Sequence, residues 1–158
     1  MARILIVGCG CRGRALAEAL QGDGHAVRGT TRGAALSEIE AAGAEGVVAD
    51  PDRLGTIMTQ LAGVTAVCWL LGSASGPSAA DLHGPRLETL LERLVDTPVR
   101  GFVYEGAGSV DPALLAAGAA AVRAASERWR LPAEVVEAAP ADHPAWLHAM
   151  TAAVGRLL

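Results

Sequence analysis

The chain has 158 residues, of which 51% are hydrophobic and only 3% aromatic, and its formal net charge at pH 7 is −4. This length suffices for one domain with a substantial core, which must be built mainly from aliphatic side chains. All 13 basic residues are arginine, and the absence of lysine excludes a P-loop NTPase and Schiff-base lysine chemistry. The acidic balance and the lack of a basic cluster argue against a nucleic-acid partner.

Short apolar runs and helical stretches alternate six times along the chain. The apolar runs predict strands at residues 3–7, 25–30, 45–49, 64–71, 101–105 and 133–137. Helical spacing predicts one helix over residues 11–21 and one over residues 111–129. It also predicts a helix that ends at residue 43 and helices that begin at about residues 50, 85 and 144. Pro85 and the pairs Asp50-Pro51 and Asp111-Pro112 are interpreted as helix starts, because proline suits the first helical position. The alternation predicts one α/β domain over residues 1–158, with a doubly wound parallel sheet in the order 3-2-1-4-5-6.

The first strand runs directly into Gly-x-Gly-x-x-Gly, and a helical pattern follows at once. The first glycine permits a tight turn, the second lets the backbone approach a pyrophosphate, and the third allows the helix to pack closely on the strand. The N-terminus of that helix offers free N–H groups to phosphates. We therefore expect this turn to bind a dinucleotide. The alternative is a tight turn that binds no ligand. The turn residues expected to contact the cofactor are Gly8, Cys9, Gly10, Cys11, Arg12 and Gly13.

The second strand ends in Thr30-Thr31-Arg32, where an NAD site of this type has an acidic residue for the ribose 2′-hydroxyl. No carboxylate is available at that point of the sequence. Two hydroxyls and a guanidinium suit a 2′-phosphate instead, because arginine can hold phosphate through two hydrogen bonds. The sequence therefore predicts NADP(H) rather than NAD(H), with Arg12 as a second group that could reach the 2′-phosphate. A solvated Arg32 without a ligand is the alternative.

The remaining candidate residues lie in loops at the carboxyl ends of later strands, where ligands of such sheets bind. Leu71, Gly72 and Ser73 follow the fourth strand and are expected to contribute to the cofactor site, and residues 73–83 could close over a substrate. Glu105 ends the fifth strand and could act as a base, hydrogen-bond a ribose or amide, or be a solvated residue. His83 is the histidine best placed for proton transfer, a surface histidine being the alternative.

The cysteines and histidines give no metal or disulfide pattern. Three cysteines are too few for a disulfide framework, and the histidine spacing does not match a zinc motif. Cys9 and Cys11 form a Cys-x-Cys, for which a redox or metal role is the alternative to small residues filling a crowded turn. No apolar run reaches about 18 residues and no signal-peptide pattern opens the chain. We therefore expect no metal, no membrane partner and a cytoplasmic location.

Two stretches carry a family resemblance: Ile-Leu-Ile-Val-Gly-Cys-Gly at residues 4–10 and Gly-His-Ala-Val-Arg-Gly-Thr-Thr-Arg at residues 24–32. They resemble the opening of atypical short-chain dehydrogenase/reductase proteins with NAD(P)-binding Rossmann folds, and the similarity extends to Asp50, a position that lies near the adenine in that family. The resemblance implies an NADP-type cofactor site. That family uses a Tyr-x-x-x-Lys pair for catalysis, whereas this chain lacks lysine and its only tyrosine, Tyr104, lies within a strand. The usual reductase mechanism is therefore not expected.

Two classes of function remain open from the sequence. One is an NADP(H)-binding module that senses the cofactor or regulates a partner, which a short chain without a substrate lobe favours. The other is an NADP-dependent oxidoreductase on a small carbonyl or hydroxyl substrate that uses Glu105 or His83.

The helices at residues 112–129 and from 144 have wide apolar arcs, and the second arc includes Met150 and Val154. A monomer would leave part of such surfaces in contact with water, so a homodimer through these two helices is predicted. Deep packing of both helices against an alanine-rich core is the alternative.

Overall fold

The predicted six-stranded parallel sheet is present in the computed structural model, which describes residues 1–158, and its order is β3-β2-β1-β4-β5-β6. The strands are β1 (Arg3–Val7), β2 (Ala26–Thr31), β3 (Glu45–Val48), β4 (Ala66–Trp69), β5 (Phe102–Glu105) and β6 (Ala133–Val136). The helices are α1 (Cys11–Gly22), α2 (Leu36–Ala41), α3 (Leu54–Met58), α4 (Ala79–Leu82), α5 (Pro85–Leu94), α6 (Pro112–Trp129) and α7 (His143–Leu157). The fold class and strand order are therefore confirmed.

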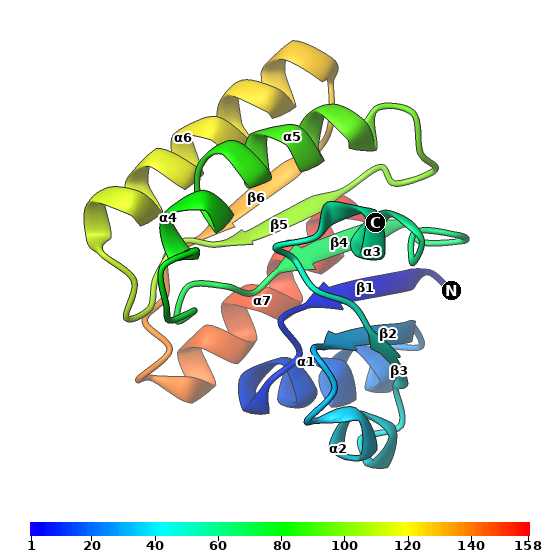
Figure 1. Cartoon of the computed structure of the whole chain (residues 1–158). Coiled ribbons are helices and arrows are strands. Elements are labelled where there is room, and N and C mark those ends of the chain that lie inside the picture. The colour runs from blue at the N-terminus through cyan, green and yellow to red at the C-terminus, as the bar shows by residue number, and fades with distance from the viewer.

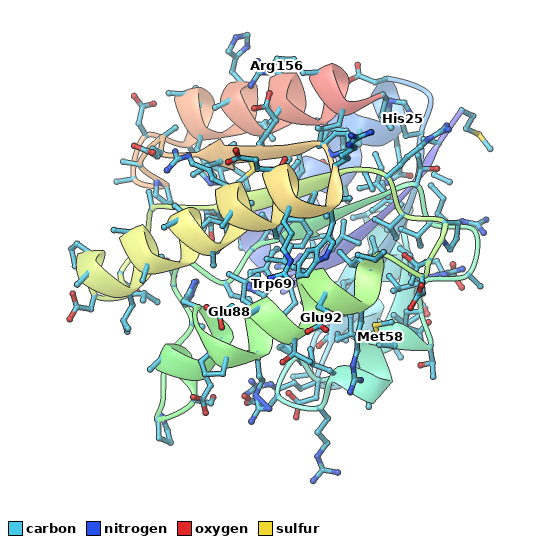
Figure 2. All side chains as sticks on the ribbon, turned by 90° about the horizontal axis from the view of Figure 1, so that it is seen from above. His25, Met58, Trp69, Glu88, Glu92 and Arg156 are labelled. Atoms are coloured by element: carbon cyan, nitrogen blue, oxygen red, sulfur yellow. The ribbon has the colours of Figure 1, made fainter.

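Helices cover both faces of the sheet, with α4, α5 and α6 on one face and α1, α2 and α7 on the other (Figure 1). Side chains of β1 alternate between the two cores: Leu5 and Val7 pack with α5 and α6, and Ile4 and Ile6 pack with α1 and α7. All four are fully buried, which explains why the first strand is an unbroken apolar run. Figure 2 looks onto the face of α5 and α6, with Trp69 of β4 beneath them.

The strand order reverses between β1 and β4, whose registered pairs run from Ile4 opposite Ala66 to Val7 opposite Trp69. The loops that follow these two strands therefore meet at the carboxyl edge of the sheet. Open sheets of this type bind ligands at such a reversal. None of the helices combines the length and hydropathy needed to cross a bilayer.

Two of the predicted helix starts are correct and one is wrong. Helix α5 begins at Pro85, and Asp111 caps α6 by accepting a hydrogen bond from the Ala113 amide at 2.9 Å. Asp50-Pro51 does not begin a helix, because α3 starts at Leu54. The Asp50 carboxylate instead accepts the Asp52 amide in a turn, at 2.9 Å. The loop predicted at residues 73–83 also contains the short helix α4.

Helix α7 packs more deeply than the sequence indicated. Trp146, Met150 and Val154 are fully buried in the core that α7 shares with α1 and the sheet. The prediction that Met150 and Val154 form a dimer contact is therefore wrong, because both belong to the interior of one chain. The large apolar side chains that remain exposed are Met1, Val48, Val95 and Leu158.

Candidate functional site

The turn after β1 contains three glycines, whose surroundings differ. Gly8 has φ = +81°, and a Cβ there would lie 2.6 Å from the carbonyl oxygen of Leu70. A Cβ on Gly10 would meet nothing within 4 Å, so the backbone is open to a ligand there. A Cβ on Gly13 would lie 3.3 Å from the Cys9 sulfur, because helix and turn pack closely. The predicted roles of Gly8 in a tight turn and of Gly13 in close helix packing are confirmed, and that of Gly10 beside a pyrophosphate stays a prediction.

The N-terminus of α1 has no cap. Gly10 offers no side chain to it, and no acidic residue lies in its first turn. The first backbone hydrogen bond of the helix joins the Arg14 amide to the Gly10 carbonyl at 2.9 Å. The amides that precede this bond have no acceptor within the helix, and the helix dipole favours an anion beside them. Asp111 and Asp142 cap α6 and α7 with their carboxylates, whereas the other helices, like α1, have no side-chain cap.

Two cavities lie next to this turn at the carboxyl edge of the sheet. One, of about 300 Å³, is lined by the glycine turn together with Arg12 and Ser73. The other, of about 220 Å³, is lined by the end of β2 and residues of the loop after β3. Gly8, Leu71 and Ala74 belong to the walls of both, so the two cavities adjoin as halves of one groove. We call them the turn half and the β2 half of the groove.

The two threonines at the end of β2 hold the backbone around the β2 half. Thr30 is buried, and its Oγ1 accepts the Gly8 amide at 3.2 Å. The Thr31 hydroxyl accepts the amides of Gly33 and Ala35 at 3.2 and 3.3 Å. Both side chains therefore fix the turns beside the groove, a role that the sequence did not indicate.

Arg32 follows β2 with its side chain 58% exposed, but it is not free of partners. Its Nε lies 3.3 Å from Asp50, and its Nη2 lies 3.0 Å from Asp52, which also pairs with Arg86 at 3.2 Å. The prediction that this end of the groove lacks a carboxylate is wrong. Strand β2 ends without one, but β3 is its parallel neighbour, so the loop after β3 brings two carboxylates to the same edge.

Glu105 is fully buried at the end of β5 and is neither a solvated residue nor a base open to a substrate. Its carboxylate accepts hydrogen bonds from the Gly72 amide at 2.8 Å and from the Trp146 indole at 2.9 Å. Arg12 donates to both carboxylate oxygens through Nη2, at 3.1 and 3.2 Å. Glu105 therefore joins the turn after β1, the loop after β4 and helix α7.

Arg12 lies in the turn half of the groove, whereas Thr31 and Arg32 line the β2 half. The prediction that Arg12 shares a 2′-phosphate with Arg32 does not agree with this arrangement, because its guanidinium is held by Glu105 on the β5 side. The other predicted turn residue with a side chain at the groove is Cys11, which is exposed, while Cys9 is buried against Gly29. Burial raises the pKa of the Cys9 thiol to about 11 and that of Cys68 to about 12, so both are inert thiols at neutral pH.

His83 is buried, so the alternative of a surface histidine is wrong. Its Nε2 donates to the Leu71 carbonyl at 2.7 Å, which leaves Nδ1 to accept the Tyr104 hydroxyl at 2.6 Å. Burial lowers the pKa of His83, although its bond to Leu71 raises it in part. Burial and the charge of Glu105 raise the pKa of Tyr104. The pair is therefore neutral and anchors α4 beneath the groove.

A third and larger cavity, of about 700 Å³, lies between the loop after β5, helix α6 and the loop after β6. Ser73 lines both this cavity and the turn half of the groove, so the two spaces meet at that residue. Its hydroxyl accepts the Ser109 amide at 3.3 Å. Ser109 does not cap α6, since Asp111 has that role. Gly72 is packed against the loop after β5, where its Cβ would lie 2.2 Å from the Ala107 carbonyl.

The sequence interpretation missed Asp52 and Trp146 as residues of the site. The only signal for Asp52 is an acidic residue in the loop after a strand that neighbours β2. Trp146 fits the apolar pattern of the last helix, and nothing in the sequence indicates that its indole N–H has a buried carboxylate partner. No three side chains of His, Cys, Asp or Glu gather in a way that could hold a metal ion.

Comparison with solved structures identifies proteins of the same fold. A protein from Bacillus halodurans described as an NAD-dependent epimerase/dehydratase superposes with a TM-score of 0.71 at 23% identity, covering 88% of this chain and 71% of that one. A short-chain dehydrogenase/reductase superfamily protein from Agrobacterium tumefaciens with bound NAD gives a TM-score of 0.68 at 22% identity, covering 84% of this chain and 48% of that one. A UDP-glucuronic acid 4-epimerase from Bacillus cereus, in complex with UDP-4-deoxy-4-fluoro-glucuronic acid and NAD, gives a TM-score of 0.65 at 15% identity. The match covers 84% of this chain and 55% of that one.

This chain has a Rossmann fold, as these solved structures do. No family profile matches its sequence, and no curated protein is similar to it. The chain spans about half the length of several of these solved structures, since the match covers 55%, 48% and 53% of three of them. At these identities the likeness concerns the Rossmann fold alone, and the function must be argued from the groove itself.

Proposed function

We propose that this chain binds a nicotinamide dinucleotide in the groove, with NADP(H) preferred to NAD(H), and that it senses the cofactor or regulates a partner. The observation that carries the proposal is the uncapped N-terminus of α1, which opens beside a glycine turn into a groove at the reversal of strand order. The presence of NAD in two solved proteins of the same fold supports the choice of ligand.

The residues of the turn half fit a diphosphate. The backbone is open at Gly10, and the first amides of α1 lack acceptors within the helix. Arg12 lines this half of the groove with its side chain 30% exposed, so its guanidinium offers donors there. These groups would hold the two phosphates, while the β2 half would take the adenosine. Its ribose would lie near Thr31 and Arg32, which line this half, and its adenine near Asp50, the partner of Arg32.

The preference for NADP(H) follows from Arg32. Exposed ion pairs contribute at most about 1 kcal/mol each, so a doubly charged 2′-phosphate can replace Asp50 and Asp52 as its partner. Charge-assisted hydrogen bonds contribute about 1.5–3 kcal/mol, but repulsion by the two carboxylates reduces the gain. The expected preference is therefore moderate.

Calorimetric titration with NADP⁺, NADPH, NAD⁺ and NADH tests this proposal. We expect all four to bind, and Arg32→Ala to weaken the two phosphorylated forms by about 1–3 kcal/mol with little effect on the other two. Arg130→Ala, at an exposed position after α6, is the matched control. Equal affinities for NADP⁺ and NAD⁺ in the wild-type protein would refute the 2′-phosphate proposal, and no binding would refute dinucleotide binding.

A sensing role is favoured over catalysis by the burial of the candidate acids. Glu105 is ion-paired with Arg12, and His83 is engaged with Tyr104 and Leu71. The chain also has no lysine to assist a tyrosine. Its three cysteines are free thiols, which supports a reducing compartment such as the cytoplasm as its location.

An oxidoreductase is the second candidate, and the 700 Å³ cavity favours it. This cavity meets the turn half at Ser73, where the nicotinamide end of a bound dinucleotide would emerge, and it has room for a small substrate. Bound NADPH would supply a hydride. The chain itself would offer the hydroxyls of Ser73 and Ser109 for orientation, and Arg123 at the cavity wall for an anionic group. Loss of NADPH absorbance with members of a carbonyl panel would establish turnover, whereas its absence across the panel favours the sensing role.

A homodimer also stays a proposal, with contacts different from those that the sequence suggested. Because the large side chains of α7 are buried, α6 must supply most of the contact. Its exposed face is rich in alanine, which allows close helix approach: Ala113, Ala116, Ala117, Ala120 and Ala124.

A further inference from the structure

We propose that Arg12 contacts the diphosphate of the dinucleotide and that Glu105 is the residue that positions Arg12 for this contact. The inference rests on the proposed dinucleotide binding and deepens it. It assigns the two arginines of the groove to different phosphates: Arg12 to the diphosphate in the turn half, and Arg32 to the 2′-phosphate in the β2 half.

The guanidinium of Arg12 keeps donors available for a ligand. An arginine has five N–H donors, yet the hydrogen bonds of Arg12 to Glu105 and Ser73 all come from Nη2. Its Nη1 donates no hydrogen bond within the chain, so this nitrogen keeps its N–H groups for a ligand. The side chain is 30% exposed and lines the turn half, so it is accessible to an anion there. A diphosphate bound at the adjacent uncapped helix end would accept hydrogen bonds from these N–H groups.

The carboxylate of Glu105 is built to hold this arginine in one place. It is fully buried and receives donors from three separate parts of the chain: Arg12 of α1, the Gly72 amide and the Trp146 indole of α7. The guanidinium carbon of Arg12 also lies 5.6 Å from the centre of the Trp146 ring, a cation–π distance. A free arginine side chain has many rotamers, and this enclosure excludes many of them before a ligand arrives.

The same carboxylate connects both walls of the turn half. Gly72, which donates to it, stands between Leu71 and Ser73, and both of these line the groove. Glu105 thereby fixes the loop after β4 relative to the turn after β1. Because the Arg12–Glu105 pair is neutral as a whole, its benefit to the ligand comes from directed hydrogen bonds rather than from added positive charge.

Binding of two half-ligands tests the assignment of Arg12. Adenosine 5′-diphosphate carries the diphosphate without the 2′-phosphate, and adenosine 2′-monophosphate carries the 2′-phosphate without the diphosphate. In calorimetric titrations we expect Arg12→Ala to weaken the first ligand at least about tenfold and to leave the second within about twofold. Arg32→Ala is the matched control and should show the opposite pattern. If wild-type protein binds both ligands and Arg12→Ala binds the diphosphate as wild type does, the inference is overturned and the proposed function stands.

A double-mutant cycle tests the positioning role of Glu105. Glu105→Gln keeps the size of the side chain but removes the charge that holds Arg12, and it should weaken adenosine 5′-diphosphate by roughly fivefold or more. In the Arg12→Ala background the same substitution should have no further effect, since Glu105 acts through Arg12. An equal loss in both backgrounds, or tighter binding by Glu105→Gln, would show that Glu105 does not position Arg12.

A second variant keeps the test decisive if Glu105→Gln does not fold. Trp146→Phe removes the indole donor and leaves the Arg12–Glu105 ion pair, so thermal unfolding can verify that the variant is folded. It should weaken the diphosphate ligand in the wild-type background and not in the Arg12→Ala background. Failure of the wild-type protein to bind either ligand would refute the proposed function itself, which separates that outcome from the failure of this inference.

Discussion

Removal of one negative charge beside Arg32 should increase the preference for NADP(H). Asp52 is the residue to change, because it pairs with Arg32 at 3.0 Å and with Arg86 at 3.2 Å on the β2 side of the groove. Asp52→Asn keeps an oxygen that can accept a hydrogen bond from Arg32. The substitution therefore removes the charge and retains most of the geometry.

The size of the effect follows from Coulomb's law. Two anions on opposite sides of one guanidinium lie about 6 Å apart, which gives about 0.7 kcal/mol per unit charge in water and about 3 kcal/mol at an effective dielectric constant of 20. The Asp52 side chain is only 23% exposed, but Arg86 already neutralises part of its charge. A 2′-phosphate carries a charge of about −1.5 to −2. We expect a gain of about 1 kcal/mol, or about fivefold, in the affinity for NADP⁺.

The assay is calorimetric titration of Asp52→Asn with NADP⁺ and NAD⁺ at low and high salt. NAD⁺ affinity should stay within about twofold, and the gain for NADP⁺ should shrink at high salt because screening weakens the removed repulsion. Asp96→Asn, at an exposed position after α5, is a charge-matched control away from the groove. Weaker NADP⁺ binding by Asp52→Asn would mean that Asp52 matters by holding Arg32 in place rather than by repelling phosphate.

Three further predictions concern stability and assembly. Gly118→Ala should destabilise the fold by about 1–3 kcal/mol in urea unfolding, because its Cβ would lie 2.0 Å from the Tyr104 hydroxyl, while Gly155→Ala, with nothing within 4 Å, should be neutral or stabilising. Folding lowers the pKa of His83, so the unfolded chain binds more protons than the folded one. The contribution of His83 to the free energy of unfolding should be complete above its ordinary pKa of 6.5 and fall as the pH drops below that value. In His83→Gln the free energy of unfolding should depend less steeply on pH. If α6 forms a homodimer, light scattering should give twice the mass of one chain, and Ala120→Glu should return it to one; a wild-type monomer would exclude the dimer.

The fold was predictable because its signals are local in sequence. The unbroken apolar run from Ile4 to Val7 reflects burial on both faces of the sheet, and the glycines after it reflect a turn that must pass under the carbonyl of Leu70. The start of α6 at Asp111-Pro112 is likewise decided within a few residues. Repeated six times, this alternation allows few topologies other than a doubly wound parallel sheet.

The partners of the charged side chains were not predictable, because distant parts of the chain supply them. Arg12 and Glu105 are 93 positions apart, and Arg32 and Asp52 are 20 apart. Asp50-Pro51 shows the same limit at short range: the pair has the composition of a helix start, but Asp50 turns its carboxylate toward Asp52 and Arg32. A charge at a strand end indicates that chemistry is present there, and the fold decides whether that charge meets a ligand or a counterion.

Both arginines of the groove are already paired with carboxylates, and this arrangement bears on the choice between a sensor and an enzyme. Arg12 is held by Glu105, and Arg32 by Asp50 and Asp52. A phosphate that binds to a paired guanidinium gains less than one that binds to a free cation, because it shares or replaces an existing interaction. Affinity is therefore reduced while orientation is kept. Reduced affinity suits a protein whose occupancy must follow the concentration of its ligand, since a site saturated at all concentrations would report nothing.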